Sequence, residues 1–239
     1  MPDKIILVDR IGDVTFRKNK RSKNVSITIR PLKGVIVNLP QYVSYGFAKN
    51  IVEKKRDWIL KHLPKIEKIE NKLTVFTPST DFFTKYRQLS IIPEKTDHVK
   101  TLITPEKILI KYPEHIHVKD HRIQEIIRNT ITKTLRTEAK SYLPQRTEVL
   151  AQQLNFKFNK VFIKNTKTLW GSCSAQNNIN LNLHLMRLPD HLIDYVIIHE
   201  LCHTIEKNHG RQFWELMDSV LGNAKSLSKE LQKHSIQIY

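Results

Sequence analysis

Alternation of apolar and polar residues dominates the first half of the chain. Residues 25–30 (Val-Ser-Ile-Thr-Ile-Arg) alternate cleanly, and residues 34–39 also read as an apolar strand. A two-residue period places successive side chains on opposite faces, which is typical of a half-buried β-strand. The pattern predicts further strands at residues 14–16, 89–92 and 107–110.

One helix is predicted to interrupt these strands, from about Ser44 to His62. Its apolar side is expected to consist of Phe47, Ile51, Trp58 and Ile59. After Pro113 the period changes, because Ile123, Ile127, Ile131 and Leu135 recur every four residues and predict a long helix. Pro144 is expected to kink or restart that helix before Leu150 and Leu154.

These patterns predict an α+β protein with a β-rich amino-terminal region, residues 1–115, and a second domain, residues 116–239. The chain has 239 residues and 40% hydrophobic residues, enough to bury a substantial core. No apolar run approaches the length of a membrane span, and the start of the chain does not resemble a secretory signal. The two cysteines, Cys173 and Cys202, fit a reducing compartment, so we expect a cytoplasmic protein with no membrane partner. Cys202 is expected to fill the core.

A buried helix is predicted to carry the chemistry. Residues 192–198 are almost entirely apolar, Pro189 and Asp190 supply a start signal, and the sequence His199-Glu200-Leu201-Cys202-His203 follows. Residues four apart lie on one face of a helix, so the imidazoles of His199 and His203 can share one zinc ion with Glu200 beside them. Buried imidazoles that had no partner would cost free energy, and a metal satisfies both at once.

A catalytic zinc needs a third protein ligand. His209 is favoured, because Asn208 and Gly210 are helix-stop residues that would let the chain leave the helix near Lys207 and return to the metal. Glu206 lies about two turns along the axis from His199, roughly 10 Å away, which is awkward for the same ion. Other acidic candidates come from a later helix and remain open: Glu215 and Asp218.

Several segments together resemble the YgjP-like metallopeptidase family, a zincin-like group related to the SprT-like proteases. The resemblance is strong over residues 135–220 and rests on five segments: Trp170-Gly171-Ser172-Cys173-Ser174, Asn178-Ile179-Asn180-Leu181-Asn182, His199 to His203, Asn208-His209 and Phe213-Trp214. It extends more weakly to residues 54–59. Thr204 and Gly210 depart from the family pattern, which usually has Leu and Ser there.

The family resemblance implies a zinc peptidase with His199, His203 and His209 as ligands and Glu200 as the catalytic residue. It also implies a protein or peptide substrate. In zincin-like folds, the strand at residues 178–183 offers an open edge to an extended peptide, so Asn180 and Asn182 are candidate substrate-binding residues. The alternative is an ordinary internal strand with solvated asparagines.

The formal net charge is +17, and the stretch Arg17–Lys23 concentrates it in what reads as a hairpin turn. Lys18, Lys20, Arg21 and Lys23 are therefore candidate contacts to a nucleic acid or nucleoprotein. Lysine-rich surfaces are also often simply solvated. The alternative function is thus a nucleic-acid-binding module with a closed, structural zinc site, whereas Glu200 favours hydrolysis because a structural site needs no extra carboxylate. Tyr195 is a candidate for stabilising the oxyanion, although it is also placed to pack in the core.

Overall fold

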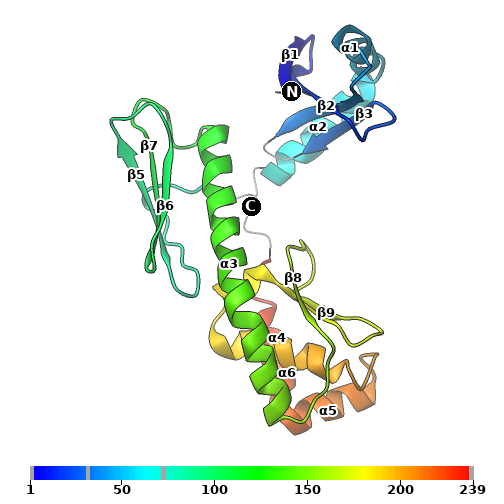
Figure 1. The fold of residues 1–239 in the computed structure, drawn as a ribbon, viewed down its shortest axis with the longest axis vertical. Helices are drawn as coiled ribbons and strands as arrows, with labels where there is room; N and C mark the ends of the chain where they lie inside the picture. Colours follow the sequence, from blue (N-terminus) through cyan, green and yellow to red (C-terminus); the bar gives the residue numbers. More distant parts are fainter. Residues whose placement is uncertain (1–2, 31–32, 71–73, 237–239) are drawn as a thin grey trace. The chain divides into compact units, whose positions relative to one another are not determined.

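The computed structural model describes residues 3–30, 33–70 and 74–236 (Figure 1). Its α+β content confirms the predicted fold class. The chain divides into two compact units, residues 1–74 (unit 1) and residues 75–238 (unit 2). None of the described helices combines the length and the apolar character needed to cross a membrane.

Unit 1 is a four-stranded sheet with two helices, shown in blue and cyan in Figure 1. The strands lie in the order β1 (Lys4–Val8), β2 (Gly12–Asn19), β4 (Gly34–Pro40) and β3 (Ser26–Arg30). β2 and β4 are parallel, and the other neighbours are antiparallel. The predicted strands at residues 14–16, 25–30 and 34–39 are thus confirmed, whereas β1 was not predicted. One basic segment was misread: β4 lies between β2 and β3, so residues 17–23 do not form a hairpin turn.

The segment predicted as one helix is two helices, α1 (Tyr45–Lys54) and α2 (Arg56–Glu70). The start is as predicted, because the Ser44 side chain accepts a hydrogen bond from the Phe47 amide at 3.1 Å and caps α1. The apolar side was largely wrong. Ala48, Val52 and Ile59 pack in the core with the sheet, whereas Phe47, Ile51 and Trp58 stay at the surface. On α1 the small Ala48 side chain lets the helix approach the sheet more closely than Phe47 would.

Unit 2 is organised along one helix, α3 (His121–Gln153). A first sheet has the order β5 (Gln88–Glu94), β7 (Lys107–Pro113) and β6 (Lys100–Ile103). A second has the order β8 (Val161–Lys164), β10 (Ile179–Asn182) and β9 (Gly171–Cys173). After β10 come η1 (Leu183–Arg187), α4 (Asp190–Cys202), α5 (Arg211–Leu221) and α6 (Ala224–Leu231).

The three sheets share one arrangement of three successive strands. In each, the strand that comes last in the sequence lies between the other two and runs parallel to the first and antiparallel to the second. The sets are β2–β3–β4, β5–β6–β7 and β8–β9–β10.

α3 supplies the apolar spine of unit 2. Its predicted face is confirmed, since Ile123, Ile127, Ile131 and Leu135 are all buried. The expected restart at Pro144 is wrong, because the helix runs through it without a break, whereas a kink there stays a prediction. Proline removes one backbone donor, but buried side chains on both sides of it hold the helix in place. These side chains include Leu143, Thr147 and Leu150.

The predicted boundary at residue 115 falls inside unit 2. β7 packs against α3, and the buried Glu138 of α3 accepts hydrogen bonds from Arg87 at 2.6 Å and Thr84 at 2.8 Å. Residues 75–113 are therefore tied to the helix that follows them. Separate domains at residues 1–115 and 116–239 stay a prediction.

Candidate metal centre

α4 carries the residues predicted to bind metal. It begins at Asp190 directly after Pro189, and most of its residues are buried, as the apolar run predicts. Its last residues bring His199 and His203 to one face, with ring centroids 4.9 Å apart.

The structure brings His209 to the same point. Its Nε2 atom lies 2.9 Å from Nε2 of His199 and 3.1 Å from Nε2 of His203. The three ligand atoms lie within 4.8 Å of one another, and no acidic or cysteine side chain joins this cluster among the described residues. Nitrogens bound tetrahedrally to zinc at about 2.0–2.1 Å stand roughly 3.4 Å apart, so the three histidines fit one ion.

The turn between α4 and α5 makes this convergence possible. α4 ends at Cys202, earlier than the predicted exit near Lys207, and Gly210 is the N-cap position of α5 and not a stop for α4. His203 Nδ1 lies 2.8 Å from the backbone carbonyl oxygen of Glu206. A proton on Nδ1 donated to that carbonyl leaves the Nε2 lone pair free for a metal.

Phe213 of α5 forms the floor of the cluster. Its ring is fully buried and stacks on His203 at a centroid distance of 4.4 Å and an interplanar angle of 22°. It meets His199 and His209 edge to face, at 4.9 and 4.8 Å. One aromatic ring thus restricts all three imidazoles.

The electrostatics favour neutral imidazoles. Burial, together with repulsion from His203 and His209, lowers the pKa of His199 to about 3. Burial also lowers the pKa of His203, against a hydrogen bond to Glu206 that raises it. Neutral rings offer lone pairs, which is the form that binds metal.

Glu200 follows His199 in α4 and is buried, with 5% of its surface exposed. Burial raises the pKa of Glu200 from 4.5 to about 8. Its Oε2 atom has no hydrogen-bond partner among the described residues. Buried carboxylates are normally paired, so an unpaired one beside three histidines indicates a functional role.

Gly171 of β9 makes room for Glu200. A Cβ atom added at Gly171 would lie 2.6 Å from Oε1 of Glu200 and 2.8 Å from its Cγ. This role of Gly171 was not predicted from the sequence. A glycine inside a strand is the available signal, since it often marks close approach of another group.

The asparagines of β10 have structural hydrogen bonds. β10 is internal, paired with β8 on one side and β9 on the other, so the open edge predicted for it is wrong. Asn182 donates to the carbonyl oxygens of Thr166 and Leu169 at 2.9 and 2.8 Å and caps η1 through its Oδ1. Asn180 donates to Ser172. Contact of Asn180 and Asn182 with a substrate stays a prediction.

The alternative ligands are engaged elsewhere. Glu215 pairs with Arg211 at 2.6 Å, and Asp218 accepts a hydrogen bond from the Ala224 amide. Cys202 is buried as predicted, and burial raises its pKa to about 12. Cys173 lies outside the cluster, 4.0 Å from Lys207 Nζ. Tyr195 is buried, with its ring centroid 6.0 Å from that of His199.

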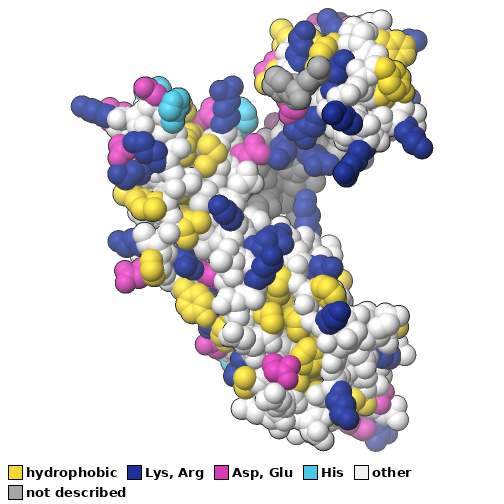
Figure 2. Space-filling model, in the orientation of Figure 1, with side chains coloured by type: hydrophobic (Ala, Val, Ile, Leu, Met, Phe, Trp, Pro, Cys, Tyr) yellow, Lys and Arg dark blue, Asp and Glu magenta, His cyan; other side chains and the backbone are white. Residues whose placement is uncertain are grey.

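The basic residues of unit 1 lie outside this centre. Lys18 donates to the Gln41 carbonyl at 2.9 Å and stands over the Tyr45 ring, whereas Lys20, Arg21 and Lys23 are exposed. On the face shown in Figure 2, Lys and Arg side chains are spread over the surface and do not gather in one patch. Nothing in the comparisons that follow points to nucleic acid, so this role stays a prediction.

Comparison with solved structures finds two archaeal proteins. One is the metallopeptidase zymogen of Pyrococcus abyssi abylysin, at 23% identity, with 37% of this chain and 91% of that chain covered and a TM-score of 0.34. The other is the metallopeptidase zymogen of Methanocaldococcus jannaschii jannalysin, at 22% identity, with 37% and 92% covered and a TM-score of 0.34. A comparison with curated proteins gives no match.

The comparison with protein families covers most of the chain. Residues 23–234 match the family described as YgjP-like, metallopeptidase domain. The match contains every residue of the histidine cluster, Glu200 and Gly171, and it reaches into both units. The chain belongs to the YgjP-like metallopeptidase family.

Proposed function

We propose that this metallopeptidase is a zinc enzyme that hydrolyses peptide bonds in protein or peptide substrates, with Glu200 as the general base. The observation that carries the proposal is the convergence of the His199, His203 and His209 Nε2 atoms, with a buried carboxyl group, that of Glu200, on the helix that carries His199 and an Oε2 atom without a hydrogen-bond partner. His209 is exposed, so the cluster is open to solvent on that side and a substrate can approach it.

The three histidines would hold the metal. Three imidazole nitrogens and an open side are the donor set of a catalytic zinc, whereas a structural site is closed by four protein ligands. When bound, zinc would act as a Lewis acid that makes a water molecule more acidic and polarises the scissile carbonyl.

Glu200 would move the proton. Its carboxylate is not a member of the ligand cluster and keeps an oxygen without a partner, so it can accept a proton from the attacking water. The protonated side chain would then deliver that proton to the leaving amine.

Replacement of Glu200 tests this mechanism. Glu200→Gln is nearly isosteric and removes the proton acceptor but no ligand, so the variant should fold, keep about one zinc per chain and lose hydrolysis by two or more orders of magnitude. Zinc is measured by elemental analysis, and cleavage with a panel of unfolded proteins at several salt concentrations. Undiminished hydrolysis in zinc-loaded Glu200→Gln protein would remove Glu200 from the mechanism. The same panel left uncut by both proteins would favour a structural metal site.

A further inference from the structure

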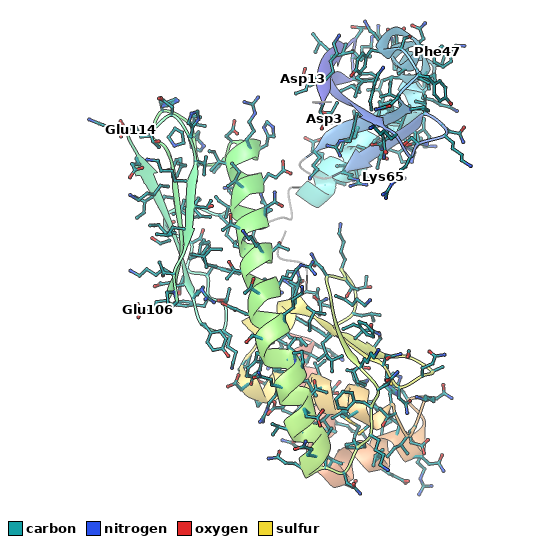
Figure 3. The ribbon with its side chains drawn as sticks, in the orientation of Figure 1. Asp3, Asp13, Phe47, Lys65, Glu106 and Glu114 are labelled. Atoms are coloured by element: carbon teal, nitrogen blue, oxygen red, sulfur yellow. The ribbon has the colours of Figure 1, made fainter. Side chains whose placement is uncertain are left out.

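Helices α1 and α2 leave large apolar side chains at the surface of unit 1. Phe47 is 59% exposed, Trp58 is 44% exposed and Ile51 is partly exposed. The inner sides of the two helices already contribute Ala48, Val52 and Ile59 to the core, so the surface residues are not needed for packing. In Figure 3, where Phe47 is labelled, it lies at the periphery of the unit.

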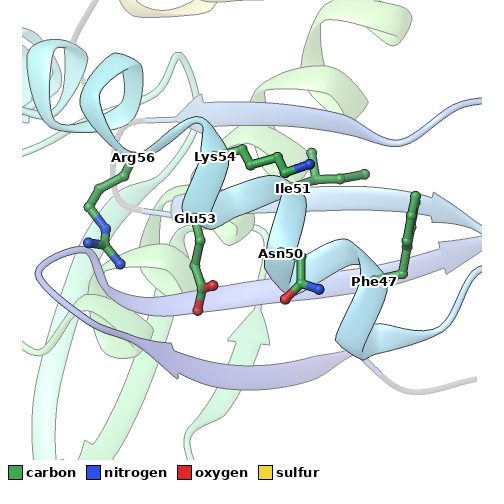
Figure 4. Close-up of a pocket in the computed structure, with 6 residues that line it drawn as sticks. All are labelled: Phe47, Asn50, Ile51, Glu53, Lys54 and Arg56. Atoms are coloured by element: carbon green, nitrogen blue, oxygen red, sulfur yellow. The ribbon is translucent and has the colours of Figure 1, made fainter.

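These side chains line two adjoining hollows that share Ile51. The first has a volume of about 500 Å³ and lies along α1 and the start of α2, where Figure 4 shows its lining: Phe47, Asn50, Ile51, Glu53, Lys54 and Arg56. The second continues to the sheet and is lined by Val25, Ile27, Ile51, Lys55 and Trp58. We call the two hollows together the α1 groove.

The charge around the α1 groove is positive. Lys54, Lys55 and Arg56 form no ion pair among the residues that the structure describes. The one acidic residue of the lining, Glu53, lies 3.9 Å from Lys49, one turn away. Residues 1–74 as a whole contain 17 lysines and arginines against 7 aspartates and glutamates. A ligand of this groove must therefore combine apolar side chains with negative charge.

A polypeptide fits this lining better than a nucleic acid does. Single-stranded nucleic acids bind to aromatic rings with open faces, on which bases stack. Trp58 has one face covered by His62, at a centroid distance of 4.5 Å and an angle of 32°. Val25, Ile27 and Ile51 are aliphatic, and they offer contact to Leu, Ile or Phe side chains of a peptide.

We propose that the α1 groove binds flexible polypeptide segments in which Asp or Glu residues alternate with large apolar ones, and thereby recruits protein substrates. The recruitment step rests on the proposed peptidase function, whereas the binding step does not. Apolar side chains enter the hollows, and the acidic ones face Lys54, Lys55 and Arg56.

Binding is measured on the full chain carrying Glu200→Gln, which prevents turnover. The probe is a fluorescein-labelled peptide of about 20 residues that alternates Glu with Leu and Phe, followed by fluorescence polarisation. Three further probes are compared: the same peptide with Ser at the apolar positions, the same peptide with Lys at the acidic positions, and oligothymidylate of similar length. The proposal expects the first probe to bind at least about tenfold more tightly than the other three.

Two variants and their matched controls locate the binding site. Phe47→Ser with Trp58→Ser, and separately Lys54→Glu with Lys55→Glu, should each weaken binding of the first probe at least about tenfold. Tyr42→Ser removes an aromatic ring that is 82% exposed outside the groove, and Lys61→Glu with Lys65→Glu changes the same charge on another part of α2. These controls should bind like the parent protein.

Three results would overturn the proposal. The charge variants at Lys54 and Lys55 and at Lys61 and Lys65 could weaken probe binding equally, while the Phe47 and Trp58 variant binds like the parent. That result would show general electrostatic attraction. Tighter binding of oligothymidylate would identify a nucleic-acid surface. A dimer in sedimentation experiments that Phe47→Ser with Trp58→Ser dissociates would show that a second copy of the chain covers the groove.

Recruitment is read from kinetics with Glu200 intact. For a protein substrate that carries the alternating segment, the groove variants should raise KM and leave kcat unchanged, and hydrolysis of a short peptide without the segment should not change. Unchanged KM for the segment-bearing substrate would contradict recruitment. If no substrate is hydrolysed although the probe binds, the peptidase mechanism fails and the binding site stands.

Discussion

Gly171 sets where the Glu200 carboxylate can lie. A Cβ atom at this position would come within 2.6 Å of Oε1, closer than real Cβ contacts, so the glutamate would have to move. A displacement of about 1 Å at a catalytic group can reduce the rate roughly 10²-fold. Gly171→Ala should therefore lower kcat by about that factor while zinc content, measured by elemental analysis, stays at the wild-type level.

Two further variants separate this effect from a general loss of folding. Gly46→Ala is the matched control, because nothing lies within 4 Å of a Cβ added there. Glu200→Asp in the Gly171→Ala background shortens the side chain by one methylene and relieves the contact. If the two residues touch, the kcat of the double variant should be higher than the value obtained by multiplying the fractions of wild-type kcat that the two single variants retain. Additive losses would contradict a direct contact between the two residues.

His209 is the least buried of the three candidate ligands, and it comes from the turn and not from α4. His209→Ala leaves only the two imidazoles of the helix, so zinc occupancy after purification should fall well below one per chain. Elemental analysis checks this, with Glu215→Ala as the control because Glu215 pairs with Arg211. Loss of zinc from the control instead would transfer the third ligand to Glu215.

Burial of Glu200 should also be visible in the stability of the metal-free protein. Its pKa is raised to about 8, above the ordinary 4.5, so the folded state binds this proton more tightly than the unfolded chain does. Stability that this group contributes at low pH is therefore lost as the pH rises from about 4.5 to about 8. In chelator-treated samples at pH 8.5, the free energy of unfolding of Glu200→Gln should exceed that of wild type by up to an amount on the order of 4 kcal/mol. The variant should therefore melt at a higher temperature. At pH 4.5 the two should melt together, and equal melting at both values would contradict the burial argument.

At the scale of elements, α5 supports the histidine cluster through Phe213, which contacts all three imidazoles. Phe213→Leu keeps an apolar side chain but removes the flat floor, so zinc affinity should fall about 10- to 100-fold, as for other residues that orient metal ligands. Competition with a chromogenic chelator measures this. Trp214→Leu is the control on the same helix, because the Trp214 ring is partly exposed and its centroid is 6.4 Å from that of His209. A similar loss in both variants would assign the effect to the helix as a whole.

Local patterns were enough to predict many elements and most of the centre. The period of Ile123, Ile127, Ile131 and Leu135 gave the buried face of α3, because a long helix with one apolar stripe has one way to pack. The four-residue spacing of His199 and His203 on a buried helix gave two members of the histidine cluster. His209 followed from the need for a third donor, although α4 ends earlier than expected and the turn that delivers His209 is therefore longer.

What the sequence did not show depends on contacts between distant segments. The order of strands decides that β10 is internal, and no period within β10 records its neighbours. The close approach of Gly171 to Glu200 joins residues 29 positions apart, and a glycine alone does not name its partner. Likewise, the inner side of α1 is selected by the space above the sheet, which favours Ala48 over Phe47.

At the scale of the whole molecule, the family match includes much of unit 1, although the histidine cluster, Glu200 and Gly171 all lie in unit 2. Unit 1 adds no residue to that centre in the described part of the chain, and its surface is the more basic. A unit that carries charge and exposed apolar side chains but no catalytic group is suited to binding, which is the role that the α1 groove would give it.

The shared arrangement of the three sheets constrains when each sheet can form during synthesis. Because the last strand of each set lies between the other two, β8 and β9 have no partner until β10 has left the ribosome. β9, which places Gly171 beside Glu200, therefore takes its position only as α4 is about to emerge, and Phe213 follows later still. The residues that would cut peptide bonds are thus assembled after the amino-terminal unit has been synthesised. During translation, unit 1 has the opportunity to fold before any peptidase activity exists that could digest it.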